Sequence, residues 1–448
     1  MDLLSAPRSE LIRIIYEQQD KITALETQIA EIKARLNNQD PKQQNKPPSW
    51  VKPNIKNKKK GPRKKREENF GRKLDIPTKQ IFHSFNICPD CNGRLGKPAI
   101  SYTRQTIDIP PSKVEITEHV ICKRWCFSCK KRVTPKVNLM DTVSNQQRIG
   151  IRLMSIITML KEACRQPLKT IQSYLEIMHD FHLSQGAIIN VLHKVAEKGK
   201  PTYESLLKRI RDSDLVFADE TGGRENGKNG YNWSFSNNKI HFLLYRKSRG
   251  KQVVDEVLGD GFEGVLSTDF YAAYNTYSGF HQRCWVHLLG DIKDLVELYP
   301  NDKELDKWAK KIHAIYEEAK AYSGPNDNLP AGIIAQERIN KQRYFEDKLR
   351  AICAPLVKTE KPMSILCSRI TKYLQELFVF IRFEGIPSDN NTAERILRHT
   401  VVKRKISGGT RSAKGSETNS ILTSLFDTWK LQNKNPLTQC QLLLASCP

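Results

Sequence analysis

The sequence lacks any run of about 18 apolar residues, the length that a membrane-spanning helix needs. Its N-terminus, residues 1–5, carries Asp2 and lacks the basic and apolar regions of a secretory leader. Acidic residues are in short supply: 49 Asp and Glu stand against 73 Lys and Arg, giving a net charge of +24 over 448 residues. We therefore expect no membrane span, residence in a reducing cytoplasm, and an acidic partner such as nucleic acid or an anionic membrane surface.

In a reducing compartment the eleven cysteines are metal ligands or buried thiols rather than disulfides. Four of them form two Cys-x-x-Cys pairs, Cys88-Pro89-Asp90-Cys91 and Cys126-Phe127-Ser128-Cys129. Each pair places two thiolates on a tight turn, and two such turns can close a tetrahedral Zn²⁺ site. We expect Cys88, Cys91, Cys126 and Cys129 to bind one structural zinc ion. Strands at 101–109 and 113–122 are expected between the pairs, and Cys122 is a spare thiol that can replace a ligand.

The first 38 residues show a heptad pattern. Its a positions are Ile15, Ile22, Ile29 and Leu36, and its d positions are Leu11, Leu25 and Ile32, with Gln18 as a polar exception. Mostly Ile at a with Leu prominent at d favours a parallel coiled-coil dimer. The alternative is an amphipathic helix packed on its own protein, because four heptads are near the minimum for a coiled coil.

Residues 39–75 predict a disordered basic linker. Five prolines in this stretch break any helix, and from Lys42 to Arg66 no acid separates the basic residues. Such a segment either only solubilises the chain or adds a salt-sensitive, sequence-independent attraction to phosphates.

Residues 139–212 predict helices. Leu168, Ile171 and Leu175 mark one amphipathic helix, and a second opens at Leu183-Ser184-Gln185-Gly186. A helix, a short turn and a helix indicate either a helix-turn-helix or plain helical packing, since no base-reading signature accompanies them.

From residue 214 the pattern becomes α/β with a mixed sheet. Strands are expected at 215–219, 231–236, 240–245, 264–269 and 280–284, a helix at 250–258, and turns at Gly222-Gly223 and Asn237-Asn238. A mostly helical insertion follows, with an amphipathic stretch around Trp308, Ile312, Ile315 and Tyr316. The expected domains are 1–38 (coiled coil), 39–75 (linker), 76–138 (zinc-binding), 139–212 (helical), 213–299 (catalytic, first part), 300–385 (helical insertion), 386–432 (catalytic, second part) and 433–448 (C-terminal tail).

Three acidic residues suggest the chemistry of this region. Asp219 ends the apolar run 215–218, Asp269 ends the run 265–268, and Glu394 follows the cap-type residues 388–391 at the start of a helix. Two carboxylates at strand ends and a third on a later helix can converge on two divalent cations. Such hard oxygen ligands suit Mg²⁺, which takes part of its shell from substrate phosphates. Taken singly, an Asp at a strand end is more often a turn or cap residue.

The chain resembles the DDE transposases of bacterial insertion sequences, and more narrowly the insertion sequence 66 family of the TnpC type. The resemblance covers nearly the whole chain. Its motifs are Ala218-Asp219-Glu220-Thr221-Gly222, Ser267-Thr268-Asp269-Phe270-Tyr271-Ala272-Ala273-Tyr274, Cys284-Trp285-Val286-His287, and Asp389-Asn390-Asn391 through Glu394-Arg395 to Arg404-Lys405. One departure from the family pattern is Ile406-Ser407-Gly408-Gly409-Thr410, where an aromatic residue is often expected.

The resemblance implies an RNase H-like catalytic core in which Asp219, Asp269 and Glu394 hold two Mg²⁺ or Mn²⁺ ions. It implies that the protein binds the terminal inverted repeats of its element, cuts there, and joins the freed ends to target DNA. Arg395, Arg398, Arg404 and Lys405 are the expected contacts to the DNA backbone. The zinc module is expected to help bind DNA, and the protein to act as at least a dimer beside the bacterial nucleoid, with accessory proteins possible.

Two alternatives to a transposase remain: a metal-dependent RNase H-like nuclease without strand transfer, and a zinc-finger DNA-binding regulator. A copy that binds DNA but has lost the ability to cut would also fit, although all three acids are present. The pair Cys284 and His287 is either half of a second zinc site or, as we expect, a structural or substrate-positioning element beside the catalytic residues.

Overall fold

A computed structural model describes residues 75–109, 112–137, 148–322, 324–325 and 329–446, together with Leu25. The predicted coiled coil and the predicted basic linker therefore lie outside the described residues, except for Leu25 of the first and Asp75 of the second. The chain divides into two compact units, residues 1–108 and residues 109–448. No helix of the described part is long and apolar enough to cross a membrane.

The described part of the first unit is a chain with little regular structure. Its main local feature is a turn at the first cysteine pair, where Cys88 N–H donates to Gly93 O at 3.0 Å and Asn92 N–H to Cys88 O at 2.9 Å. Farther along, Gln105 and the Asp75 backbone exchange two hydrogen bonds of 2.6 and 3.0 Å. The strand predicted at 101–109 is wrong, because this stretch is largely exposed and pairs with no other strand of the described chain.

The second unit begins with a small hairpin that carries the second cysteine pair. Strand β1 (Arg124–Cys126) pairs antiparallel with β2 (Lys131–Val133), and Lys130 closes the turn with φ of 48°. The strand predicted at 113–122 is absent from these described residues, and the two-stranded ladder forms only after it. An isolated apolar alternation without a partner strand has no ladder to satisfy its amides.

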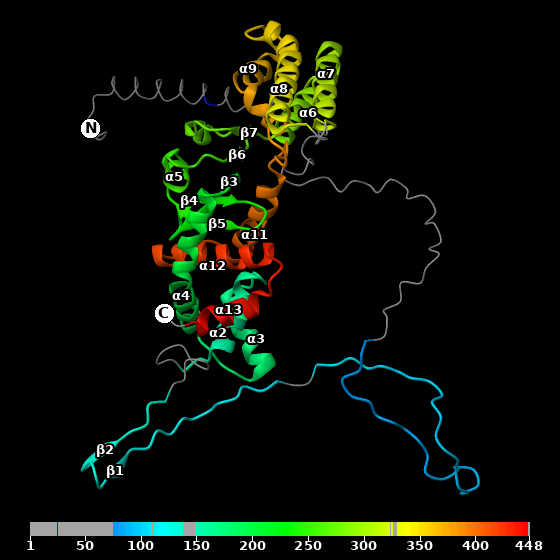
Figure 1. Cartoon of the computed structure of the whole chain (residues 1–448), viewed down its shortest axis with the longest axis vertical. Coiled ribbons are helices and arrows are strands. Elements are labelled where there is room, and N and C mark those ends of the chain that lie inside the picture. Colours follow the sequence, from blue (N-terminus) through cyan, green and yellow to red (C-terminus); the bar gives the residue numbers. More distant parts are fainter. Residues whose placement is uncertain are drawn as a thin grey trace, which may run out of the picture. The chain divides into compact units, whose positions relative to one another are not determined.

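The central element is a five-stranded mixed sheet with the order β5-β4-β3-β6-β7 (Figure 1). Its strands are β3 (Leu215–Glu225), β4 (Lys228–Ser236), β5 (His241–Arg246), β6 (Val265–Thr268) and β7 (His281–Arg283). Strand β4 pairs antiparallel with both β3 and β5. Strand β6 pairs parallel with both β3 and β7. This confirms the predicted α/β class with a mixed sheet.

Strand β3 is six residues longer than predicted, and the turn expected at Gly222-Gly223 is wrong. Both glycines lie inside the β3–β4 ladder, where Gly222 pairs with Tyr231 and Gly223 with Gly230. The turn occurs instead at Asn226 and Gly227, whose φ angles are 49° and 76°. Two central residues with positive φ are typical of a tight hairpin turn, and Asn-Gly is its usual sequence. Asp219 consequently lies in the middle of a strand rather than at its end.

Helices cover the sheet and extend beyond it (Figure 1). They are α2 (Ile151–Glu162), α3 (Leu168–His179), α4 (Gln185–Arg211), α5 (Gln252–Leu258), α6 (Trp285–Leu298), α7 (Lys303–Lys320), α8 (Ala331–Cys353), α9 (Ser364–Lys372), α10 (Val379–Arg382), α11 (Asn391–Ser407), α12 (Ala413–Leu431) and α13 (Pro436–Ala445). Three single 3₁₀ turns are η1 (Ala272–Thr276), η2 (Ala354–Leu356) and η3 (Gln375–Leu377).

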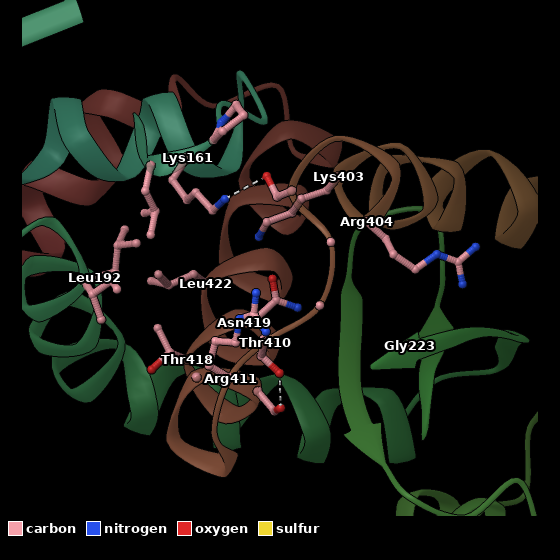
Figure 2. A pocket seen from close by; sticks show the side chains of 18 of the residues that line it. Lys161, Leu192, Gly223, Lys403, Arg404, Thr410, Arg411, Thr418, Asn419 and Leu422 are labelled. Atoms are coloured by element: carbon pink, nitrogen blue, oxygen red, sulfur yellow. Dashed lines mark hydrogen bonds between the residues drawn. The ribbon is translucent and has the colours of Figure 1, made fainter. Parts of the chain in front are cut away.

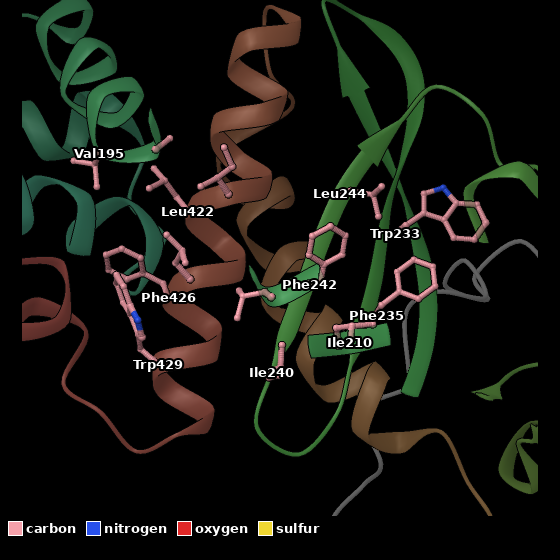
Figure 3. Close-up of a cluster of buried hydrophobic side chains, with 14 of the residues drawn as sticks. Val195, Ile210, Trp233, Phe235, Ile240, Phe242, Leu244, Leu422, Phe426 and Trp429 are labelled. Carbon is pink, nitrogen blue, oxygen red and sulfur yellow. The ribbon is translucent and has the colours of Figure 1, made fainter. Parts of the chain in front are cut away.

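The antiparallel strands are packed on apolar side chains at one face and on polar side chains at the edge strand β5. On one face Trp233, Phe235, Phe242 and Leu244 are buried with Ile210 of α4 (Figure 3). At the edge strand β5 the cover is polar. The hydroxyls of Ser420, Ser424 and Thr428 on α12 accept hydrogen bonds from the β5 amides of Tyr245, Leu243 and His241 at 2.8–3.1 Å. These α12 hydroxyls are four residues apart and the β5 amides are two residues apart, and the two spacings correspond to similar distances along a helix and a strand. Helix α12 therefore supplies acceptors for the backbone amides of the edge strand.

Two apolar cores lie in this unit. The first joins α2, α3, α4, α12 and α13 to the sheet, and the second joins α6 to the helices α7–α10. Helices α3 and α4 confirm the two helices predicted there, and buried Ile171, Leu175 and Ile188 attach them to the first core. Trp308, Ile312, Ile315 and Tyr316 are buried in the second core, which confirms the predicted amphipathic stretch. The segment 433–448, expected as a tail, contains α13 packed on α2.

Candidate functional site

Asp219 and Asp269 lie on neighbouring parallel strands. Phe217 of β3 pairs with Ser267 of β6. Asp219 lies two residues after Phe217, and Asp269 lies two residues after Ser267. Asp269 comes directly after β6 and accepts a hydrogen bond from Tyr271 N–H at 2.8 Å. The register therefore sets the two carboxylates at equivalent positions of adjacent strands.

Glu394 reaches the same region because the loop before α11 is fixed on both sides. Asn390 donates its side-chain amide to Ala218 O at 2.9 Å, directly beside Asp219, and its backbone N–H to Cys284 Sγ at 3.2 Å. Trp285 N–H donates to Ser388 O at 3.0 Å. These contacts place the first turn of α11, with Glu394, near β3.

The pKa of Asp219 reflects this arrangement. Burial, followed by the charges of Glu220, Asp269 and Glu394, raises the pKa of Asp219 to about 7. Within the described part of the chain, no ion pair reaches Asp219 or Asp269. The charges of Asp269 and Glu394 thus act on Asp219, and of the three acids only Glu394 has a cationic side chain, His287, within ion-pair distance in the described part of the chain.

The acids are nevertheless not drawn together into a closed ligand set. Across the described residues, no three His, Cys, Asp or Glu side chains are close enough to hold one metal ion as they stand. Carboxylate oxygens are suitable ligands for Mg²⁺ or Mn²⁺, which keeps waters and takes further oxygens from a substrate phosphate. The donor set fits such ions, with the remaining ligands left to come from outside the protein.

Glu220, the neighbour of Asp219 in sequence, is compensated instead. Arg249 Nη2 lies 2.6 Å from Glu220 Oε1, and the Tyr274 hydroxyl donates to Glu220 Oε2 at 2.6 Å. The side chain of Glu220 is only 2% exposed. The structure therefore separates two adjacent acids that the sequence does not distinguish: Glu220 holds Arg249 and Tyr274, whereas Asp219 is free to take a cation.

Cys284 and His287 lie beside the acids. Cys284 is fully buried, and His287 Nε2 is 3.6 Å from Glu394 Oε1. Hydrogen bonding with Cys284 raises the pKa of His287 to about 9, and Glu394 and Asp269 add to this effect. In the described part of the chain this pair joins no cluster with the ligand number of a zinc site. The observed place agrees with the expected position beside the acids.

A positioning residue that sequence reasoning missed is Arg283. It is fully buried at the end of β7 and donates to Asp269 O at 2.8 Å, to Glu376 Oε2 at 2.6 Å and to Asn275 Oδ1 at 2.5 Å. Its guanidinium also stacks 4.7 Å from the ring centroid of Tyr373. These contacts hold the turn that carries Asp269, and no local pattern around Arg283 announces them.

The four predicted DNA contacts all lie on α11. Arg395, Arg398 and Lys405 are exposed. Arg404 is half-buried and donates to the carbonyl of Gly222, three residues beyond Asp219. An added Cβ at Gly222 would lie 3.2 Å from Arg404 Nη1, so glycine leaves room for this close approach.

The cysteine pairs each form a tight turn suited to thiolates. Backbone hydrogen bonds, first from Asp90 and then from Cys91, lower the pKa of the Cys88 thiol, and that of Cys129 lowers the pKa of the Cys126 thiol. Cys129 N–H lies 3.4 Å from Cys126 Sγ. Cys88 and Cys91 belong to the first compact unit, and Cys126 and Cys129 belong to the second. Cys122 is exposed and free.

Comparison with known proteins connects these features to one family. Residues 146–418 match the family model described as Transposase IS66 family, and residues 86–130 match the zinc-finger binding domain of transposase IS66. The first match contains all three acids, and the second contains both cysteine pairs.

Two curated proteins of Sinorhizobium fredii (strain NBRC 101917 / NGR234) are similar to the chain. "Uncharacterized protein y4jD" is 24% identical over 382 residues, which are 78% of this chain and 72% of that protein. "Uncharacterized protein y4jO" is 28% identical over 153 residues, which are 34% of this chain and 44% of that protein. The family model spans more than half of the sequence, and the chain belongs to the Transposase IS66 family.

Proposed function

We propose that this transposase cuts DNA at the ends of its insertion sequence and joins those ends to target DNA, using Asp219, Asp269 and Glu394 with two Mg²⁺ or Mn²⁺ ions. The observation that carries the proposal is the grouping of Asp219 on β3, Asp269 directly after β6 and Glu394 on α11, with no ion pair to Asp219 or Asp269 among the described residues. When bound, the two cations would stabilise both the attacking and the leaving oxygen of an in-line phosphoryl displacement.

The sheet supports an RNase H-like reading of the core. Three antiparallel strands followed by two parallel ones, in the order β5-β4-β3-β6-β7, put the central strand β3 next to β6. Asp219 lies on that central strand, between Asp269 on one side and the α11 helix that packs against β3. Asp219 would be the ligand shared by both ions, because it lies on the central strand between Asp269 and the helix that carries Glu394.

Other residues of the chain would hold the DNA and the catalytic elements in place. Arg395, Arg398 and Lys405 are exposed for contact with phosphates, and Arg404 fixes the end of α11 to β3. Arg283 and Asn390 act as positioning residues for Asp269 and Glu394. His287, beside Glu394, would donate a hydrogen bond to the phosphate that is cut.

The test is a strand-transfer assay with the full chain and oligonucleotides that end in the element's own terminal repeats. Wild type should cut and join these ends with Mg²⁺, whereas Asp219→Asn, Asp269→Asn and Glu394→Gln should do neither while still binding the ends. Asp260→Asn, an exposed acid outside the group, is the matched control and should keep activity. Cleavage without joining by wild type would instead identify a nuclease, and full joining by one of the three variants would remove that residue from the site.

We also propose that Cys88, Cys91, Cys126 and Cys129 bind one structural Zn²⁺ and that this domain helps bind the element's ends. The match to the zinc-finger domain and the lowered pKa values of Cys88 and Cys126 support this assignment. Elemental analysis should give one zinc per chain for wild type and none for Cys91→Ser, with the exposed Cys164→Ser as control. Zinc retained in Cys91→Ser would contradict the ligand set.

The proposed coiled coil of residues 1–38 would bring two chains together, as the joining of two DNA ends requires. Sedimentation of the whole chain beside a variant lacking residues 1–38 tests it. The same number of chains per particle in the two proteins would show that this segment is not the interface.

A further inference from the structure

A cavity of about 510 Å³ lies between the helices α2–α4 and the α11–α12 connection. It is separate from the three acids, none of which lines it. Its volume is in the range of pockets that hold a small organic ligand, and it is far larger than a bare ion needs. The ligand should therefore have more than one chemical part.

One wall of the cavity carries a surplus of positive charge. The basic side chains of the lining are Lys161, Lys169, Arg224, Lys403, Arg404 and Arg411, and the single carboxylate is Glu162. Lys403 Nζ already donates to Glu162, so the other cations have no carboxylate in the lining. Burial, followed by the charge of Lys403, lowers the pKa of Lys161 to about 8, although the carboxylate of Glu162 acts in the opposite direction.

Several polar groups at this wall are able to hold an anion. Lys161 Nζ donates to Ser407 Oγ at 3.0 Å, at the loop that ends α11. The N-terminus of the 19-residue helix α12, with Ser412 as its cap, opens onto the same space and adds partial positive charge. Thr400, which is only 3% exposed and lines the cavity, has a hydroxyl without a hydrogen-bond partner among the described residues.

Part of the lining is apolar. It is formed by Leu168, Ile189 and Leu192 from α3 and α4, and by Leu422 from α12, which is fully buried. Figure 2 shows Lys161, Leu192 and Leu422 around one common space, while Arg404 extends away from it. A lining that combines cationic and apolar side chains suits a ligand with a phosphate at one end and a flat, weakly polar group at the other.

We propose that this cavity binds one nucleotide, with its phosphate at Lys161 and Arg411 and its base against Leu168 and Ile189. A base taken out of a DNA stack is held in this way, between apolar side chains, with its phosphate on basic residues. The binding does not depend on the proposed cleavage at Asp219, because the cavity and the acids share no residue.

The test measures binding of thymidine monophosphate to the full chain by calorimetry, beside inorganic phosphate. Lys161→Met and Arg411→Ala should each weaken nucleotide binding by about tenfold or more, since each removes a charged partner of the phosphate. Ile189→Trp should weaken it similarly by filling the apolar side, while inorganic phosphate is unaffected. The matched controls are Arg152→Ala on α2 and Ile177→Trp on α3, both exposed and outside the lining.

A second arm identifies the source of the nucleotide. Duplex DNA with one bulged thymidine is compared with the same duplex fully paired. Tighter binding of the bulged duplex, lost in Lys161→Met but kept in Asp219→Asn, identifies an unpaired nucleotide of DNA, whereas binding of thymidine monophosphate alone identifies a free nucleotide. If neither ligand binds, or if both bind the three cavity variants as they bind wild type, the proposal is wrong.

Discussion

The two ends of α11 carry opposite charges, and both differ from its middle. At the N-terminal end the charge of Glu394 acts on Asp219, and at the C-terminal end Lys403 and Arg404 line the same cavity as Lys161 and Arg411. Both distributions agree with the helix dipole, which favours anions at the start and cations at the end.

The middle of the helix shows what a compensated charge looks like in this protein. Asp427 of α12 lies 2.8 Å from His399 Nδ1 of α11 and 2.9 Å from His241 Nδ1 of β5. Burial alone would raise the pKa of Asp427, but the two histidines outweigh it and hold that pKa well below its usual range. Asp219, which is partly buried and has no ion-pair partner among the described residues, has its pKa raised instead. The paired charges in the middle of α11 stabilise the fold. The unpaired charges at its two ends are suited to bind ligands of opposite sign, cations at the acidic end and an anion at the basic end.

The largest expected effect comes from removing one charge of the acidic end. Asp219→Asn should lower the rate of end cleavage by about 10⁴-fold, because a shared metal ligand acts as part of one unit with the other acids. Binding of the element's ends should stay within about threefold of wild type, since the phosphate contacts come from basic residues. Single-turnover cleavage and a gel-shift titration measure the two quantities. Equal losses in cleavage and in DNA binding would contradict separate roles for the acidic and the basic end of α11.

Removing a paired charge at the basic end should damage the fold instead. Lys403→Met leaves Glu162, whose side chain is 3% exposed, without its partner. Breaking a buried pair in this way costs about 3–5 kcal/mol of unfolding free energy. Denaturant unfolding should show this loss, with Lys405→Met, an exposed neighbour, unchanged. Restoration of most of the stability by the double variant Lys403→Met, Glu162→Gln would attribute the loss to the unpaired carboxylate.

Surplus negative charge at the acidic end should cost stability in the metal-free protein. The pKa of Asp219 is raised from 3.8 to about 7, so the folded state retains a proton that the unfolded state has lost. The cost begins above pH 4, grows until about pH 7 and is constant beyond it. Metal-free Asp219→Asn should therefore be more stable than wild type at pH 8 by roughly 1–4 kcal/mol, with no difference below pH 4. Thermal unfolding at the two pH values tests this, and a less stable variant at pH 8 would contradict the burial of a costly charge.

The smallest expected effect concerns the start of α12 at the basic cavity. Ser412 accepts a hydrogen bond from Gly415 N–H at 3.1 Å and so caps this helix. Ser412→Ala should lower the unfolding free energy by about 1 kcal/mol, and Ser412→Asp should restore it. Chemical denaturation of the three proteins checks the order, and no loss in the alanine variant would show that another group satisfies the helix end.

Much of the core could be predicted from sequence because its signals are local. The apolar runs before Asp219 and Asp269 marked two adjacent strands, and the cap-type residues before Glu394 marked a helix start. The predicted end of β3 is wrong because Gly222 and Gly223 have the composition of a turn, whereas the hairpin turn forms at Asn226-Gly227, the usual sequence for a two-residue turn with positive φ.

The rest depended on contacts between distant parts of the chain. Glu220 is paired with Arg249, 29 residues away, and Arg283 with Glu376, 93 residues away. Nothing near these residues in sequence indicates the partner, so the sequence alone could not show that Glu220 is compensated and Asp219 is not. The basic cavity likewise joins Lys161 to Ser407, 246 residues later.

The most direct test of the central claim is a calorimetric titration of Mn²⁺ into the full chain bound to a pre-cut element end. The DNA is included because the three acids do not form a closed ligand set without further oxygens. Wild type should bind two Mn²⁺ ions at pH 8, and Asp260→Asn should do the same. Asp219→Asn should bind neither at the same concentrations. Two Mn²⁺ ions bound by Asp219→Asn with the affinity of wild type would contradict the assignment of these acids as the metal site.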